Sequence, residues 1–188
     1  VTALDSVGGW ISHLFQYVTG SLKDVTFEVF ALEDVKSADG ESEDYYKKDE
    51  LVATITTDDT GIAKVSGLPL GKYYVKEKAT VNGFVLDNEA REIDLTYRDQ
   101  DTAEVTYSAD WQNNRQKAEV EVVKKEKDSD CVLEGAVFAL CAKNDITGAD
   151  GNVILEADTV IEELATDKEG KLTFTADLPI GFEYYIKE

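Results

Sequence analysis

Residues 68–77, LPLGKYYVKE, join a turn to an alternating strand that ends on a glutamate. Successive side chains of a strand point to opposite faces, which puts three of these residues on one face: Tyr73, Val75 and Glu77. Residues 178–188, LPIGFEYYIKE, repeat the pattern and bring Glu188 to the place of Glu77. Burying an unpaired carboxylate costs several kcal/mol. Its occurrence in two strands predicts that both glutamates take part in a chemical site.

The chain consists of two copies of one domain, offset by 111 residues. Residues 21–40, SLKDVTFEVFALEDVKSADG, align without a gap with residues 132–151, VLEGAVFALCAKNDITGADG. Tandem self-similarity of this kind indicates repeated domains. We predict an N-terminal segment at 1–19, a first domain at 20–114 and a second domain at 118–188. The join between the copies has no Gly, Ser or Pro spacer, which favours a semi-rigid tandem.

Each copy is predicted to be all-β and to form an antiparallel β-sandwich, because short β-branched and aromatic runs alternate with turns such as DDTG, LPLG and DKEG. In residues 25–31, VTFEVFA, apolar side chains occupy every second position, as expected for a half-solvated sheet. The N-terminal segment has apolar residues at helical spacing around Trp10, so a helix and a first strand both remain open there. Nothing in the second copy corresponds to the part of the first that runs from Glu77 to Asn113. We therefore expect the second sandwich to be truncated.

The composition is that of an acidic globular protein. The 188 residues carry a formal net charge of -20, with a pI near 4.3, and 43% of them are hydrophobic. This charge repels phosphate backbones and anionic lipid headgroups, so we expect neither a nucleic-acid nor a membrane partner. No apolar run approaches the roughly 20 residues of a transmembrane helix, and we see no basic leader of a signal peptide.

Two further polar residues fall on apolar strand faces. The strand after the join places Lys124 in phase with Val120 and Val122, and the end of the first copy places Asn113 in phase with Trp111. A lysine, a glutamate and an asparagine in an apolar interior are the components of an amide crosslink made by the protein itself. Burial favours the neutral amine that attacks and the protonated acid that transfers protons. Contact within a fold supplies effective molarities on the order of 10⁵ M or more.

Three stretches together resemble a known family: VVKKEKDSDCVLEGAVFAL (122–140), TDDTGIAKVSGLPLGKYYVKE (57–77) and NNRQK (113–117). They are similar to the Cna B-type, or SpaA-like prealbumin-fold, domains of Gram-positive surface proteins and pilins. The resemblance implies a prealbumin-like, immunoglobulin-like sandwich in an extracellular, cell-wall-anchored stalk or adhesin. It also implies Lys–Asn or Lys–Asp isopeptide bonds that form once, so the protein is not an enzyme with turnover.

Carried over by position, the resemblance assigns Lys124 as the crosslinking lysine, Asn113 as the closing amide, and Glu77 and Glu188 as the acids. The first copy departs from the pattern, because His13 stands opposite Lys124 in the repeat. We therefore expect no internal crosslink in the first domain. In the second domain we expect Lys124 to bond to an Asn or Asp of its closing strand. The resemblance implies no cofactor; the implied partners are neighbouring domains of the same surface protein and, for an adhesin, a host or matrix ligand.

Two other functions are compatible with the sequence. One is a host-ligand or carbohydrate-binding module with Trp10, Trp111 or the acidic loop after residue 36 as its face. The other is an accessory domain of a secreted enzyme, whose catalytic motifs would lie outside this sequence. His13 is the only histidine, which excludes a histidine-based metal cluster. Residues 145–152, DITGADGN, have the composition of a calcium loop but the spacing of a turn, so we expect no metal.

The two cysteines, Cys131 and Cys141, are predicted to be free thiols. The residues between them are predicted to form one strand, which at about 3.3 Å per residue holds the two ends about 30 Å apart. A disulfide needs its two Cα atoms within roughly 7 Å of each other. We expect Cys141 to be a small core residue.

Overall fold

A computed structural model describes residues 2–3 and 13–188 of the chain. The chain divides into two compact units. We name Thr19–Gln116 the first domain and Lys117–Glu188 the second domain; residues 13–18 belong to the same unit as the second domain. Every secondary-structure element in the described residues is a strand, so the prediction of an all-β fold is confirmed.

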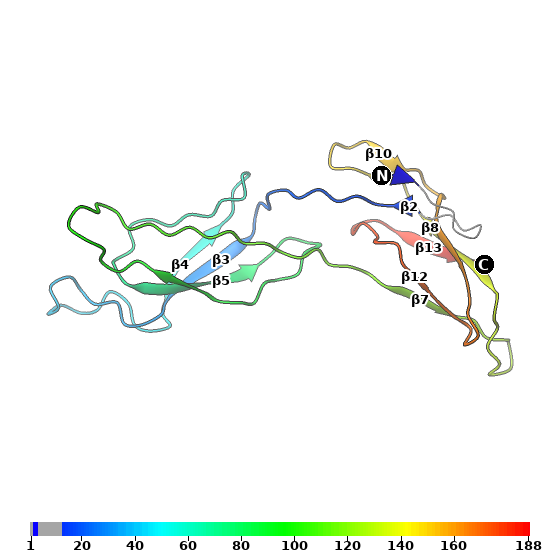
Figure 1. The fold of residues 1–188 in the computed structure, drawn as a ribbon, viewed down its shortest axis with the longest axis horizontal. Coiled ribbons are helices and arrows are strands. Elements are labelled where there is room, and N and C mark those ends of the chain that lie inside the picture. Colours follow the sequence, from blue (N-terminus) through cyan, green and yellow to red (C-terminus); the bar gives the residue numbers. More distant parts are fainter. Residues whose placement is uncertain (1, 4–12) are drawn as a thin grey trace. The chain divides into compact units, whose positions relative to one another are not determined.

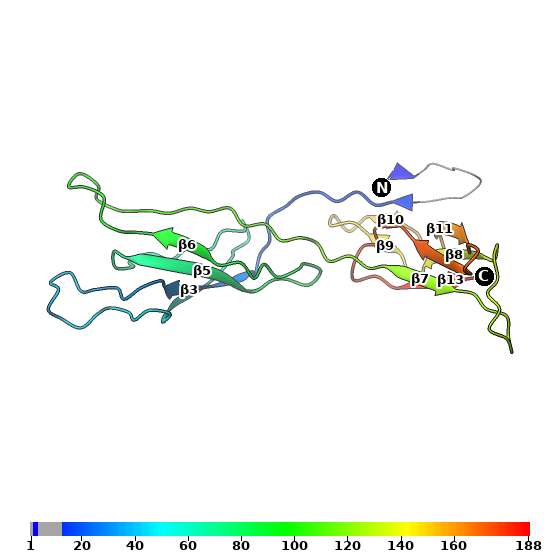
Figure 2. The ribbon, with the colours of Figure 1, turned by 60° about the horizontal axis from the view of Figure 1, so that its bottom comes forward.

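The first domain is built on one four-stranded antiparallel sheet, in the order β4-β3-β5-β6 (Figures 1 and 2). Its strands are β3 (Thr26–Ala31), β4 (Leu51–Thr56), β5 (Lys72–Ala79) and β6 (Arg91–Asp94). In the register of β3 and β5, Phe27 lies opposite Glu77. The backbone of Glu77 is therefore fixed against a central strand of the sheet.

Alternate side chains of the first domain's sheet enter its core, as the sequence pattern predicts. Four of them come from the region of β3 and are at most 7% exposed: Val25, Phe27, Val29 and Ala31. Tyr73 and Val75 of β5 join this layer, and apolar side chains of residues 63–68 pack over it together with Trp111.

The core of the second domain lies between its two main sheets. One sheet has the order β11-β8-β13 and the other pairs β12 with β7 (Figure 1). The strands are β7 (Val120–Val123), β8 (Val137–Ala142), β11 (Val160–Ala165), β12 (Lys171–Phe174) and β13 (Tyr184–Lys187). Leu140 of β8 and Leu172 and Phe174 of β12 meet in the core. The predicted tandem of antiparallel β-sandwiches is confirmed.

The predicted turn at 145–152 is the tip of a short hairpin in the second domain. Its strands, β9 (Ile146–Thr147) and β10 (Val153–Leu155), pair antiparallel (Figure 2). Asp150 accepts hydrogen bonds from the backbone and side-chain amides of Asn152 within this turn. The residues with the composition of a calcium loop therefore satisfy one another.

The segment before the first domain packs on the second domain. Within it β1 (Thr2–Ala3) pairs with β2 (His13–Leu14). Phe15 packs against the second domain's core, and the Tyr17 hydroxyl donates a hydrogen bond to the carbonyl of Asp177 at 2.7 Å. The alternative of a helix is wrong for residues 13–18, because residues 13–14 form β2 and residues 15–18 are irregular. The stretch around Trp10 lies outside the described residues.

The LPxG turns of the two copies are fixed in the same way by a tyrosine. The Tyr73 hydroxyl donates to the carbonyl of Pro69 at 2.6 Å, and the Tyr184 hydroxyl donates to the carbonyl of Pro179 at 2.7 Å. Burial, with a smaller effect of a neighbouring tyrosine, raises the pKa of both hydroxyls to about 12. Each tyrosine thus ties its strand to the preceding turn, which fixes the phase in which the strand presents its glutamate.

The two cysteines are free, as predicted, although the strand between them is shorter than expected. β8 begins at Val137, so a continuous strand from residue 131 is wrong. Gly135 interrupts it with a φ of 80°, a left-handed conformation that glycine adopts without strain. Cys131 is exposed before this turn, whereas Cys141 is buried in β8, as expected.

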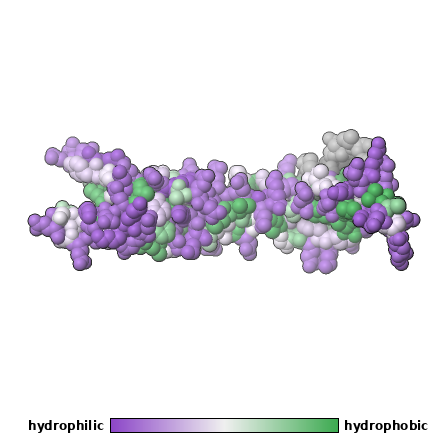
Figure 3. Space-filling view, turned by 90° about the horizontal axis from the view of Figure 1, so that it is seen from below, coloured by the Kyte–Doolittle hydropathy of each residue, from purple (hydrophilic) through white to green (hydrophobic). Residues whose placement is uncertain are grey.

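Hydrophilic side chains dominate the face of the molecule drawn in Figure 3, on which hydrophobic residues occur in small groups. This face agrees with the net charge of -20. Within the described part of the chain, no helix is long and apolar enough to span a membrane.

Candidate functional site

The first domain brings Glu77 and Asn113 into direct contact. Glu77 on β5 is 5% exposed, as its phase predicts. The Asn113 side-chain amide donates to both carboxylate oxygens of Glu77, at 2.7 and 2.8 Å. The backbone N–H of Asp87 donates to Glu77 Oε2 at 2.6 Å. The buried carboxylate is therefore fully engaged with donors, which offsets the cost of removing it from water.

Asn113 reaches this place on an irregular segment. Residues 103–113 form no strand, so the predicted closing strand is wrong for the described structure. The segment is held by a bridge between Phe84 and Arg115 and by a hydrogen bond from Val85 N to Asn114 O at 2.8 Å. This bridge and this hydrogen bond hold Asn113 beside Glu77 without extending the sheet.

A cluster that the sequence did not reveal supports the Glu77–Asn113 pair. Arg91 lies over the Trp111 ring at 3.8 Å from its centroid and donates to the carbonyl of Asp110. The same guanidinium approaches Asp87 at 3.4 Å, and the Trp111 ring packs edge-on against Phe27. The available signal was the Asp87–Arg91 spacing, which alone is too common to predict a contact. Trp111 is partly buried and packs against the first domain's core, so it does not form the exposed aromatic face of the alternative prediction.

The second domain brings Lys124 and Glu188 together. Lys124 Nζ lies 2.6 Å from Glu188 Oε2 and 5.9 Å from the centroid of the Phe138 ring. The Lys124 backbone N–H donates to Gly170 O at 2.8 Å. Gly170 has a φ of 71°, and a Cβ there would lie 2.8 Å from the Lys124 carbonyl oxygen. Glycine at this turn therefore allows the lysine-bearing segment to approach β12.

Burial of the second site is lower than predicted. The Lys124 side chain is 28% exposed and the Glu188 side chain 53%. The expectation of a buried Glu188 is wrong here, because the groups that cover Glu77 in the first domain come from residues 85–87 and Asn113, which follow it in the chain. Glu188 is the last residue of this sequence.

Each domain thus holds a different pair of the three predicted groups. The first has the acid and the amide, and no lysine among the described residues forms an ion pair with Glu77; its strand neighbour Lys78 pairs with Glu28 instead. His13, which the repeat places opposite Lys124, lies on β2 in the unit of the second domain. The second domain has the lysine and the acid.

A further buried carboxylate, Glu162 on β11, was missed by the sequence reasoning. It is 5% exposed and accepts hydrogen bonds from Thr175 N, Thr175 Oγ1 and Ala176 N at 2.6–2.9 Å. It thereby ties β11 to the segment after β12. A β-bulge between Val160 and Glu162 breaks the alternation, which is why a period-of-two reading does not identify it as buried.

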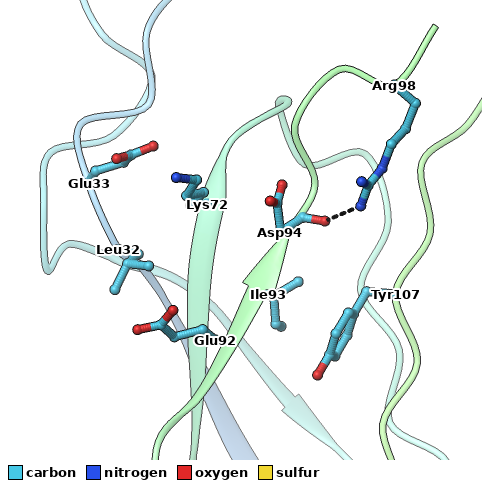
Figure 4. A pocket seen from close by; sticks show the side chains of 8 residues that line it. All are labelled: Leu32, Glu33, Lys72, Glu92, Ile93, Asp94, Arg98 and Tyr107. Carbon is cyan, nitrogen blue, oxygen red and sulfur yellow. Dashed lines mark hydrogen bonds between the residues drawn. The ribbon is translucent and has the colours of Figure 1, made fainter.

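A shallow pocket of about 430 Å³ on the first domain is lined by both signs of charge (Figure 4). Its lining includes Glu33, Lys72, Glu92 and Arg98, and the Arg98 guanidinium donates to the Asp94 carbonyl at 3.3 Å. The pocket does not include Glu77 or Asn113. Among the described residues, no group of three or more His, Cys, Asp or Glu side chains is placed to hold a metal ion.

Comparison with known proteins identifies the class of this fold as tandem prealbumin-like β domains. The family model of the SpaA prealbumin-like fold domain matches residues 16–111 and 118–188, once in each copy. The chain belongs to this family, and the predicted resemblance is confirmed. No curated protein matches the chain.

Solved structures with related folds include the Bacillus anthracis TIE protein. It is 26% identical, with a TM-score of 0.56, over 89% of this chain and 25% of the TIE chain. This chain therefore spans about a quarter of the length of that relative. Two variant forms of the shaft pilin SpaA from Lactobacillus rhamnosus GG are 18% identical, with TM-scores of 0.36 and 0.35, over 86% and 98% of this chain and 80% of the pilin chain.

Proposed function

We propose that the chain is a structural segment of an extracellular, cell-wall-anchored surface protein of a Gram-positive bacterium, in which the two β-sandwiches act as a stalk. Membership of both copies in the SpaA family supports this proposal. Hydrophilic side chains predominate on the face of the molecule drawn in Figure 3. The partners proposed for such a segment are neighbouring domains of the same protein and, if it displays an adhesive domain, a host or matrix ligand.

The second domain is proposed to be stapled by an isopeptide bond from Lys124, with Glu188 as the acid. The observation that carries this is the 2.6 Å contact between Lys124 Nζ and Glu188 Oε2, two residues that directly follow β7 and β13. Where the chain continues past Glu188, the amide partner is expected on the segment that corresponds to residues 105–113 of the first domain. Its arrival would cover Glu188 as Asn113 covers Glu77, and burial favours the neutral amine and acid that the reaction needs.

Peptide mapping of a chain that extends past Glu188 tests this function. The expected product is a branched tryptic peptide joined through Lys124, with the loss of one ammonia or one water for an Asn or Asp partner. Glu188→Gln should leave the fold intact and prevent the branch, because the proton relay is lost. Lys125→Arg is the matched control, since Lys125 is on the opposite strand face and should leave the branch unchanged. A wild-type chain without the branch would contradict the proposed staple.

A further inference from the structure

The first domain interrupts the chain path of the other compact unit. Residues 13–18 belong to the same unit as the second domain, and Thr19–Gln116 form a unit of their own. The chain therefore leaves the unit of the second domain after residue 18 and returns to it at Lys117. Segments that follow one another in a chain usually pack together, so this order calls for a specific contact between residues 13–18 and the second domain.

The exit and the return of the chain are fastened to the same residue, Asp177. The Tyr17 hydroxyl donates a hydrogen bond to the Asp177 main-chain carbonyl at 2.7 Å, and Lys117 Nζ lies 3.8 Å from Asp177 Oδ2. We name these two contacts the Asp177 clasp. Asp177 directly precedes the LPIG turn, whose Pro179 carbonyl accepts a hydrogen bond from Tyr184 of β13. The clasp therefore holds a part of the second domain that is itself tied to a strand.

The two contacts of the clasp differ in strength. Phe15, two residues before Tyr17, packs against the second domain's core, and burial of its ring strengthens the Tyr17 side. The Lys117 and Asp177 side chains are 71% and 36% exposed, so their ion pair contributes little. Val18, directly after Tyr17, is 93% exposed. The docked segment therefore ends at Tyr17, and its hold depends mainly on Phe15 and Tyr17.

We propose that the Asp177 clasp keeps the first domain out of the path of a pulling force until the clasp opens. Tension that enters ahead of Phe15 passes through the docked segment into the second domain. The loop of residues 18–116, between the two fastened points, then carries no load. A short docked segment opens at a lower free energy than a folded core. Opening would therefore add the length of the folded first domain to the chain before either domain unfolds.

This role of the clasp deepens the proposed stalk function and rests on it, because a stalk carries tension between its points of attachment. The clasp does not depend on the Lys124 branch, since it uses other residues, all of which are present in this chain. Failure of the clasp under force and absence of the branch in peptide mapping are therefore separate results.

The test pulls the whole chain in optical tweezers by handles at residues 1 and 188. The wild-type chain should give a short opening step first. The unfolding step of the first domain, roughly 340 Å at about 3.5 Å per residue, should come only after it. Moving the first handle to Thr19→Cys, in a Cys131→Ser background, places the first domain in the force path from the start. The opening step should then be absent.

Variants of the docked segment test the contacts that close the clasp. Phe15→Ala should raise the opening rate at a given force by roughly tenfold, whereas Val18→Ala, at its exposed neighbour, should leave it unchanged. Tyr17→Phe removes only the hydroxyl and should raise the rate about fivefold. Tyr45→Phe, at a half-exposed tyrosine of the first domain, is its matched control.

Two results overturn the proposal. One is a first-domain unfolding step that precedes the opening step, or occurs without one, in the wild-type chain pulled from residues 1 and 188. The other is an equal opening rate in Phe15→Ala and Val18→Ala, which would show that the short step does not report release of the docked segment.

Discussion

The two domains present the same strand and surround its last glutamate differently. In the first domain Glu77 is buried beneath segments that follow it and bonds to an amide. In the second, Glu188 is half exposed and bonds to a lysine. The strand sets only the direction of the carboxylate. Its burial, and therefore its chemistry, depends on the segments that precede and follow it in the chain. The first domain shows the effect of the following segments on Glu77, and the second shows the contact of Glu188 with the preceding Lys124.

The largest difference between the two domains is expected when the second domain includes the amide partner of Lys124. In a chain that continues past Glu188, a bond through Lys124 ties strands far apart in sequence and restricts the unfolded chain. By analogy with a long-loop disulfide, we expect it to stabilise the second domain by about 2–4 kcal/mol. Lys124→Arg should remove this stabilisation and leave the first domain unchanged, as measured by two-transition thermal unfolding. Equal stability of the variant and the parent would contradict the staple.

The next largest effect on stability is expected at a buried carboxylate that only one of the two domains has. Glu162 satisfies three donors in the second domain, and Ala53 occupies the corresponding place in the first. Glu162→Ala should destabilise the second domain by about 1–3 kcal/mol, because buried N–H groups lose their acceptor. In a Cys131→Ser background, the labelling rate of buried Cys141 reports this opening, since it is then the only thiol.

Glu163→Ala is the matched control for this variant. Its side chain is next in β11 but only half-buried. We expect little change in Cys141 labelling. A Glu162→Ala protein that labels no faster than this control would show that the three hydrogen bonds contribute nothing net.

A smaller loss is expected in the first domain. Glu77→Gln keeps an acceptor for the Asp87 N–H but places an amide against the Asn113 amide, so one good hydrogen bond is lost. We expect destabilisation of about 1 kcal/mol. Trp111 fluorescence during urea unfolding, in a Trp10→Phe background, measures it, because Trp111 packs on the core residue Phe27. If the variant is more stable than the parent, the buried Glu77 carboxylate destabilises the fold even when its hydrogen-bond donors are in place.

The smallest expected difference between the two domains is in how much stability each loses at acid pH. Hydrogen bonds, mainly from neighbouring hydroxyls, amides and lysines, lower the pKa of five carboxylates in the first domain and two in the second: Asp39, Asp44, Asp58, Asp94 and Asp99, and Asp150 and Glu183. A carboxyl group with a lowered folded-state pKa stabilises the fold above its ordinary pKa and loses this contribution as the pH falls through the folded-state value.

The melting temperature of the first domain should therefore fall more than that of the second between pH 7 and about pH 3. Asp58→Asn should reduce the difference, since the Asp58 carboxylate accepts from the hydroxyl and the N–H of Thr60. Parallel losses in both domains would indicate that these turns do not set acid stability.

Strand phase and internal repetition predicted most of the fold. Phase predicted that Glu77 points inward with Tyr73, because the alternation of a strand is local backbone geometry that the sequence encodes directly. The alignment of the copies exposed the missing lysine opposite His13. These inferences need only the period of a strand and a comparison of one copy with the other. The pairing of Lys124 with Glu188 was predicted from the resemblance to the SpaA-like family.

The parts that were missed depend on long-range packing. Glu77 is covered by segments that follow it in the chain, which strand phase alone does not place over Glu188. The position of Asn113 depends on one isolated bridge and not on a strand. The bulge that buries Glu162 breaks the period on which the prediction rests. Docking of Phe15 on the second domain joins elements more than a hundred residues apart, and no local pattern encodes such a contact.

Intact mass spectrometry of the denatured chain tests most directly whether the first domain holds an acid and an amide without an internal lysine. We predict the mass of the unmodified sequence, with Asn113 recovered in an unbranched peptide. A mass short by one ammonia, with a branched peptide that joins Asn113 to a lysine of the same chain, would contradict the prediction that the first domain has no crosslinking lysine.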